Sequence, residues 1–208
     1  IICQLANSEI GIYVKKGGPF DMPFPEIIKR AKEKPNTIKA GVGGTWTGSD
    51  VVRFILEDAT GAKFIRIPHP AGGQDLVPGV LGGHLDLAMG EGAQWAPLYK
   101  AGKFNVLAVS TERRDPRFPD IPTLKEMGYD VVLVVTFWVG APAGTPDSVI
   151  NFLAEVFRKA VAEEGYKEAS DIAFNTASYK GPADALKAVE QLDSTFQKLI
   201  KKYDLKPE

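Results

Sequence analysis

Residues 38–67, IKAGVGGTWTGSDVVRFILEDATGAKFIRI, contain a complete unit of alternating secondary structure. A short β-rich run over residues 38–42 passes into a loop of Gly, Thr and Ser. A helical pattern follows over residues 49–58, and Gly61 is placed to end that helix. A second β-rich run covers residues 63–67. A strand, a helix and a strand in this order predict two parallel neighbouring strands joined by a helical crossover.

The same alternation continues on both sides of this unit. Towards the N-terminus, a strand is expected over residues 9–16 and a helix over residues 25–34. Towards the C-terminus, a short helix over residues 74–81 precedes strands over residues 85–89 and 104–110. The first two-thirds of the chain therefore predicts an α/β unit with a largely parallel sheet.

The pattern changes beyond a charged, proline-rich loop over residues 111–122. A run of β-branched residues and Leu over residues 131–135 predicts a buried strand. Thr145 and Pro146 suit the N-cap and first position of a following helix. A final helix is expected over residues 182–202.

Composition excludes several classes of protein. The 208 residues carry 25 Lys and Arg against 26 Asp and Glu, a net charge of −1, which argues against general affinity for nucleic acid. The single cysteine, Cys3, excludes an internal disulfide framework. With only His69 and His84 as imidazoles, no metal site is expected, and no motif calls for a cofactor.

Two loops have the composition of anion-binding sites. The first follows the strand at residues 38–42 and opens directly into a helix. Glycine lets backbone N–H groups approach a ligand, and a helix N-terminus favours negative charge. The alternative interpretation, tight turns with helix caps, stays open for both loops. The candidate residues are Gly44, Thr45, Thr47 and Ser49 in the first loop, and Ala71, Gly72 and Gly73 in the second.

Four further residues, Gly90, Glu91, Trp46 and Trp138, are candidates for ligand contact. Glu91, preceded by Gly90, follows the strand at residues 85–89, where it is either a ligand group or a carboxylate at a helix N-terminus. Trp46 and Trp138 are candidates for the walls of a pocket. A nucleophile elbow of the form GxSxG is absent, so no catalytic residue is assigned.

Four segments in order resemble the substrate-binding proteins of tripartite tricarboxylate transporters, also called the Bug family. The segments are LGGHLD at residues 81–86, AGKFNVLAV at 101–109, PDIPTLKEMGY at 119–129 and APAGTP at 141–146. The resemblance implies a type II periplasmic-binding-protein fold, with two α/β domains around a cleft. Domain two is expected over residues 11–135. Residues 1–10 and 136–208 are expected to form the remainder of domain one, with the crossover strands, of which residues 1–10 are the first, and the C-terminal helices. The family's N-terminal third is expected to be missing and that domain incomplete.

The resemblance also implies a function. It predicts a periplasmic receptor, with its signal peptide outside this chain, that binds a small organic acid and delivers it to the permease subunits of a secondary transporter. A monomer without catalytic activity or nucleic-acid binding is expected. The ligand class stays open among dicarboxylates, aromatic acids and amino acids.

One departure from the family bears on the ligand. Many members have Tyr-Lys-Gly at residues 69–71 and a different residue near Glu91. A carboxylate in the pocket repels a second carboxylate unless it is protonated or paired, and it favours an ammonium or hydroxyl group. Dicarboxylates are therefore not taken as the default ligand.

Two other functions are compatible with the predicted fold. The effector-binding domain of a bacterial transcription regulator shares this fold and this approximate length, but it would need a helix-turn-helix ahead of residue 1. An enzyme using the same cleft is disfavoured by the missing catalytic motifs.

Overall fold

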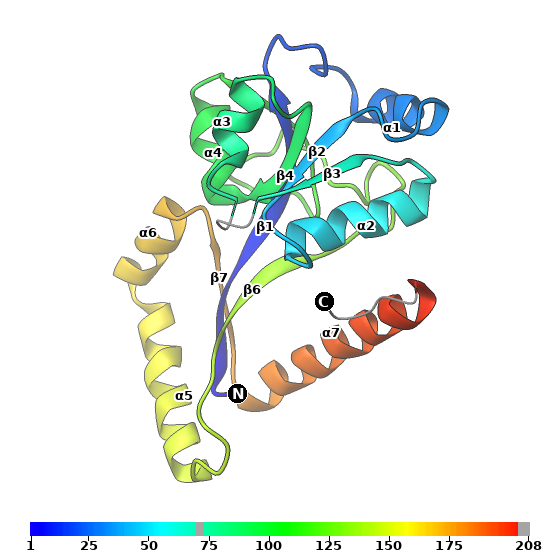
Figure 1. Cartoon of the computed structure of the whole chain (residues 1–208). Helices are drawn as coiled ribbons and strands as arrows, with labels where there is room; N and C mark the ends of the chain where they lie inside the picture. Colours follow the sequence, from blue (N-terminus) through cyan, green and yellow to red (C-terminus); the bar gives the residue numbers. More distant parts are fainter. Residues whose placement is uncertain (70–72, 204–208) are drawn as a thin grey trace. The chain divides into compact units, whose positions relative to one another are not determined.

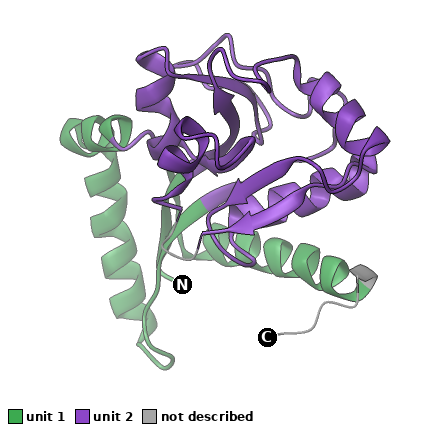
Figure 2. Cartoon of the chain, turned by 45° about the horizontal axis from the view of Figure 1, so that its top comes forward, with its two compact units in different colours: residues 1–7, 136–172, 176–208 green, residues 8–135, 173–175 purple. Residues whose placement is uncertain are grey.

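A computed structural model of the chain describes residues 1–69 and 73–203, the last two without their side chains. The chain divides into two compact units (Figure 2). Unit 1 comprises residues Ile1–Asn7, Thr136–Ile172 and Thr176–Glu208. Unit 2 comprises Ser8–Val135 and Ala173–Asn175.

Unit 2 is built on a sheet with the strand order β3-β2-β4-β1-β5 (Figure 1). Strand β2 runs parallel to both β3 and β4, as expected. Strand β1 runs antiparallel to β4 and β5, so the sheet is mixed. The strands are β1 (Cys3–Lys15), β2 (Lys39–Val42), β3 (Ile65–Pro68), β4 (Leu87–Glu91) and β5 (Phe104–Val109).

Helices cover both faces of this sheet because successive strand residues point to opposite sides. On one face, Ile10, Ile12 and Val14 of β1 join a core with α1 (Phe24–Glu33) and α2 (Gly48–Thr60). On the other face, Tyr13 packs with α3 (Leu76–Leu81) and α4 (Gly92–Lys100). We call these two clusters the α1–α2 core and the α3–α4 core.

Unit 1 contains the first residues of β1, most of β6 and the last four elements of the chain. Strand β7 pairs antiparallel with β1, with Gln4 opposite Lys180. The cluster of buried side chains is small: Ile2, Cys3 and Ala154 are its enclosed members. The elements are β6 (Val134–Val139), α5 (Asp147–Ala162), α6 (Glu164–Ile172), β7 (Thr176–Lys180) and α7 (Pro182–Tyr203).

The strand predicted over residues 131–135 is wrong in position. Strand β6 begins only at Val134 and extends to Val139. Val131 is buried, but its N–H donates to Tyr129 in a turn, and Leu133 donates to Ser110 from outside a strand. Apolar character therefore marked burial here, whereas strand pairing starts three residues later. The expected division into functional domains stays a prediction.

Candidate functional site

The carboxyl ends of three strands meet at one edge of the sheet of unit 2. Val42 of β2 lies opposite Pro68 of β3. Gly41 of β2 lies opposite Ala88 of β4. The loops that follow β2, β3 and β4 are therefore neighbours, which is where open α/β sheets bind ligands.

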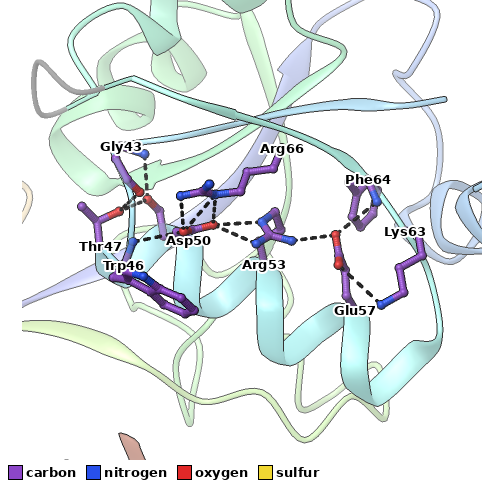
Figure 3. A network of polar contacts seen from close by, with 11 residues as sticks. Gly43, Trp46, Thr47, Asp50, Arg53, Glu57, Lys63, Phe64 and Arg66 are labelled. Atoms are coloured by element: carbon purple, nitrogen blue, oxygen red, sulfur yellow. Dashed lines mark hydrogen bonds and ion pairs between the residues drawn. The ribbon is translucent and has the colours of Figure 1, made fainter. Parts of the chain in front are cut away.

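The hydroxyl groups of the first loop bond to one another (Figure 3). Thr47 Oγ1 donates its hydrogen to the Gly44 carbonyl, 3.1 Å away. The 3.1 Å contact between Ser49 Oγ and Thr47 Oγ1 therefore has Ser49 as its donor. Ser49 Oγ in turn accepts the Gly43 N–H at 2.9 Å. Both hydroxyl hydrogens are used inside the loop.

Backbone N–H groups remain available to a ligand at this loop. Helix α2 begins at Gly48 with Thr47 as its N-cap, and no side chain caps it by a hydrogen bond. First-turn N–H groups have no partner within a helix, and the helix dipole adds positive potential there. Gly44 and Ser49 are buried, whereas Thr45 and Thr47 are exposed.

Trp46 holds an unusual backbone conformation in the same loop. Its φ is 58°, a left-handed value that is uncommon for a residue with a large side chain. The Trp46 N–H donates to Asp50 Oδ2 at 3.1 Å, which holds the turn. The indole is 46% exposed and meets Phe54 edge-on, with 6.1 Å between the ring centroids. Trp46 is thus presented at the surface rather than in the core.

A buried ionic network fixes α2 beneath this loop (Figure 3). Asp50, only 2% exposed, accepts from Arg53 Nε at 3.0 Å and from Arg66 Nε at 3.0 and 3.1 Å. Arg53 Nη1 also pairs with Glu57 at 2.8 Å, and Lys63 approaches Glu57 at 3.8 Å. Both arginines are therefore engaged by protein carboxylates.

The second loop is described only at its ends, because the candidate residues Ala71 and Gly72 lie outside the described residues. Gly73 has a φ of 78°, and a Cβ there would lie 3.3 Å from the Gly43 Cα. At the other end, the His69 N–H donates to Val42 at 2.9 Å. His69 Nε2 is buried and reaches no hydrogen-bond partner among the described residues.

Glu91 is the N-cap of α4 and forms a capping box with Gln94. The Glu91 side chain accepts the Gln94 N–H, and Gln94 Oε1 accepts the Glu91 N–H at 2.9 Å. Burial raises the pKa of the Glu91 carboxyl, and the nearby Ser8 hydroxyl lowers it by a smaller amount. Glu91 therefore acts as a helix cap in this structure. Capping does not use all of its lone pairs, because a carboxylate can accept about four hydrogen bonds.

Gln94 connects the loops that follow β3 and β4, and the sequence analysis did not identify it as a site residue. A Cβ on Gly90 would lie 2.1 Å from Gln94 Oε1, and one on Gly73 would lie 2.6 Å from Gln94 Nε2. The amide therefore fills the space between these two glycines. The spacing of Glu91 and Gln94, typical of a capping box, is the signal that could have identified it.

A second acidic residue, Glu9, was also missed. It lies on β1 and is 7% exposed. Burial and the neighbouring Asp115 raise its pKa to about 7, against the lowering effect of Arg117. Arg117 binds Asp115 with Nη2 at 2.6 Å and donates to the Asn175 carbonyl at 3.0 Å.

The remaining candidate, Trp138, lies on β6 in unit 1, outside the loops of unit 2. Over the described ranges, His, Cys, Asp and Glu side chains form no group of three suited to a metal ion. In the same part of the chain, no helix is both long and apolar enough to cross a membrane.

Comparison with known proteins identifies a family whose model matches nearly all of the chain. The tripartite tricarboxylate transporter family receptor (TctC) matches residues 1–205. A UPF0065 protein encoded in the gbd 5′ region of Cupriavidus necator is 32% identical over 167 residues, which are 80% of this chain and 50% of that protein. The chain spans about half the length of the curated relatives it matches.

Solved structures agree with this assignment. A TctC solute-binding protein from Polaromonas, solved without ligand, has a TM-score of 0.78 and 30% identity, covering 97% of this chain and 68% of that one. An R. palustris protein solved with adipate has a TM-score of 0.85 at 22% identity, covering 96% and 67%. The latter likeness concerns the fold alone.

Proposed function

Because the chain belongs to the tripartite tricarboxylate transporter receptor family, we propose that it grips a small organic acid within a periplasmic solute receptor. The fold is that of the family, as the mixed α/β sheet and the match to the Polaromonas protein show. The family consists of solute receptors rather than enzymes. Delivery of the acid to the permease of a secondary transporter is part of the proposal.

The observation that carries this proposal is the meeting of three strand-end loops around free backbone donors. Gly43 and Gly73 are in close contact, and Gln94 joins Gly73 to Gly90. The first turn of α2 opens into this junction with unpaired N–H groups. Such groups bind a carboxylate without any arginine or lysine side chain.

The proposed ligand contacts are the sequence candidates at this junction together with Gln94. Loop residues Ala71 and Gly72 stay in the proposal on the family resemblance, and Trp138 on β6 stays in it as a candidate pocket wall. Recognition needs no covalent step, because the ligand shifts a receptor towards the closed state by binding that state more tightly than the open state. The match to the tripartite tricarboxylate transporter family receptor supports an organic acid as the ligand class.

The test is isothermal titration calorimetry on the protein at the full length that its gene encodes. The panel is a set of monocarboxylates, dicarboxylates, aromatic acids and amino acids. At least one acid is expected to bind with a micromolar or lower Kd, and native mass spectrometry of freshly purified protein is expected to show a retained acid. A protein that retains none and binds no member of the panel contradicts the proposal.

Two variants test whether the first loop takes part in ligand binding. Ser49→Ala removes the oxygen that accepts the Gly43 N–H and contacts Thr47, so affinity is expected to fall about tenfold as the loop loosens. Thr37→Ala is the matched control, because Thr37 Oγ1 also closes a turn, at Lys34, away from the strand ends. Equal ligand affinities of the two variants would show that the first loop does not contribute to binding.

A further inference from the structure

Three residues of unit 2 lie between two elements of unit 1. Helix α6 ends at Ile172 and β7 begins at Thr176, both in unit 1, whereas residues 173–175 between them belong to unit 2. We call residues 173–175 the α6–β7 crossover. Strand β1 also passes between the units, at Asn7 and Ser8. When a receptor changes shape, such connecting segments absorb the backbone change, so the contacts that hold the crossover bear on that motion.

Phe174 fixes the middle of the crossover to unit 2. Its ring centroid lies 6.2 Å from that of Phe118, and Lys100 Nζ lies 5.0 Å from the Phe174 ring centroid. A Cβ on Gly92, the first residue of α4, would lie 2.8 Å from the Phe174 carbonyl oxygen, so the crossover backbone approaches α4 closely. Phe174 has a left-handed φ of 55°, a conformation that persists only where the surrounding contacts impose it.

Arg117 holds the end of the crossover. Its Nη1 donates to the Asn175 carbonyl at 3.0 Å. Its Nε and Nη2 bind the Asp115 carboxylate at 2.9 and 2.6 Å. The Arg117 and Asp115 side chains are 23% and 9% exposed, so solvent screens their charges only weakly. One guanidinium therefore joins a carboxylate to the backbone of the crossover.

Glu9 brings a second carboxyl group to this guanidinium. On β1 it shares a face with Gly11, where a Cβ would meet the Trp95 indole of α4. Burial and Asp115 raise the Glu9 pKa to about 7 and Arg117 lowers it, so these two charged groups face the carboxyl. Glu9 therefore changes its charge around neutral pH.

The charged side chains of α4 act elsewhere. Glu91, the N-cap of α4, is the register partner of Ile10 and so lies on the opposite face of the sheet from Glu9. Lys100, at the end of α4, lies over two aromatic rings, 5.4 and 5.0 Å from their centroids. The change of charge near neutral pH in this cluster is thus that of Glu9.

We propose that Glu9 is a proton-controlled release for the α6–β7 crossover: when Glu9 ionises, it draws the Arg117 guanidinium from the Asn175 carbonyl and frees residues 173–175. An ionised carboxylate attracts the guanidinium more strongly than a neutral carbonyl does, because both partners then carry a charge. A protonated Glu9 lacks that charge and leaves Nη1 on Asn175. The crossover is therefore held below neutral pH and released above it.

An NMR pH titration of the full-length protein follows this release without any ligand. The carbonyl carbon of Asn175 reports on the hydrogen bond that this carbonyl accepts from Arg117. Between pH 5 and pH 9, its chemical shift is expected to move to the unbonded value with a midpoint near pH 7. An Asn175 signal that stays constant while Glu9 titrates overturns the inference, and so does a Glu9 that ionises at about pH 4.

Two variants assign the release to Glu9 and Arg117. Glu9→Gln has a neutral side chain at every pH, so its Asn175 signal is expected to stay at the bonded value. Arg117→Lys keeps the positive charge but loses the fork that joins Asp115 to the crossover, so Asn175 is expected to give the unbonded value throughout. A titration of Asn175 that survives either substitution overturns the assignment.

Glu126→Gln is the matched control, because it also removes a carboxylate from an arginine that holds a backbone carbonyl. Arg114 donates to Glu126 and to the Pro119 carbonyl, both at 2.8 Å. The Thr123 N–H and then Arg114 lower the Glu126 pKa, so this carboxylate stays ionised throughout the titration. The control is expected to leave the Asn175 titration unchanged, and its loss would overturn the assignment.

The effect on ligand binding goes beyond the crossover and rests on the proposed function. The crossover backbone approaches Gly92, which follows Glu91 at the strand-end loops. Release is expected to raise the Kd of a bound acid about threefold between pH 6 and pH 8, and Glu9→Gln to remove this ratio. Calorimetry measures both. Equal ratios for the two proteins overturn the effect on binding, whereas a protein that binds no acid contradicts only the receptor function.

Discussion

Glu9 is a buried acid whose ionisation makes the stability of the fold depend on pH. Its carboxyl lies on the face of β1 opposite Ser8, 7% exposed, and its pKa is raised to about 7 by burial first and by Asp115 second. An unfolded chain ionises glutamate near pH 4.3. The folded protein therefore holds an extra proton between these two values.

This difference predicts a stability that falls as pH rises. Wherever the native state binds more protons than the unfolded state, the free energy of unfolding decreases with pH. For Glu9 the decrease spans about pH 4 to pH 7. Glu9→Gln is expected to flatten the decrease and to be more stable than the wild type at pH 8 by about 1–3 kcal/mol.

Urea unfolding at pH 5, 6.5 and 8 measures this effect. Glu91, whose pKa is also raised, contributes to the slope of both proteins, so the difference between them isolates Glu9. Parallel curves for the two proteins would show that Glu9 ionises at an ordinary pH.

Gly90 tests the close packing of Gln94. A methyl group there would meet Gln94 Oε1 at 2.1 Å and displace the amide from the Glu91 N–H. Gly90→Ala is expected to cost about 1 kcal/mol of stability and to weaken acid binding. Gly140→Ala is the control, because a Cβ at Gly140 has open space around it. Comparable losses in thermal unfolding and calorimetry for both variants would refute this role of Gln94.

The residue types of the site could be predicted from the sequence, but their hydrogen-bond directions could not. Thr47 and Ser49 stood out as hydroxyls before a helix. Whether those hydroxyls face a ligand or one another depends on the turn at Trp46, which places Thr47 Oγ1 on the Gly44 carbonyl. Glu9 gave no signal, because the charged groups that help to set its pKa, Asp115 and Arg117, lie more than a hundred residues away in the sequence.

At the scale of elements, α2 is the helix whose charges are most deeply buried. Arg53 stands between Asp50 and Glu57, and its side chain is 9% exposed. Arg53→Met is expected to leave carboxylates with fewer partners in the core and to cost roughly 3–5 kcal/mol. Chemical denaturation measures this loss.

Arg158→Met supplies the comparison on another helix. Arg158 pairs with Glu155 one turn away on α5, but both side chains are about half exposed. Little or no change in the denaturation midpoint is expected, because water replaces an exposed ion pair. A loss as large as that of Arg53→Met would contradict the contrast between buried and exposed pairs.

Elements with one apolar face were predicted well, and elements with mixed faces were not. Helix α2 was expected over residues 49–58 and spans Gly48–Thr60, because its apolar stripe and Gly61 both mark it. Strand β7, with the sequence TASYK, has no apolar alternation and was missed. Apolar alternation indicated β1 only from residue 9, because buried polar residues, Gln4 and Ser8, interrupt its pattern. The strand expected over residues 1–10 came from the family resemblance.

At the scale of the molecule, the two units differ in how many apolar side chains they bury. Unit 2 holds the α1–α2 core and the α3–α4 core. In unit 1 the enclosed members of the cluster are Ile2, Cys3 and Ala154, and Phe152 on α5 is 68% exposed. Local stability follows buried apolar contact.

Hydrogen exchange should therefore separate the units. Amides of β2, β4 and β5 are expected to exchange at least about a hundredfold more slowly than those of α5 and α7. Mass spectrometry of peptides after deuterium labelling measures this difference. Uniform protection across both units would show that unit 1 is stabilised by contacts beyond those described.

The pairing of Gln4 with Ser178 and Lys180 joins residues separated by 174 positions or more. On the ribosome, residues 8–135 form one unbroken run, so nearly all of unit 2 has left the exit tunnel before β7 is translated. Residues 4–7 of β1 cannot pair with β7 until residues 176–180 have been translated. Translation order thus lets residues 8–135 of unit 2 fold before the β1–β7 pairing can form, and until then the β7 side of residues 4–7 is an unpaired strand edge that is prone to aggregation.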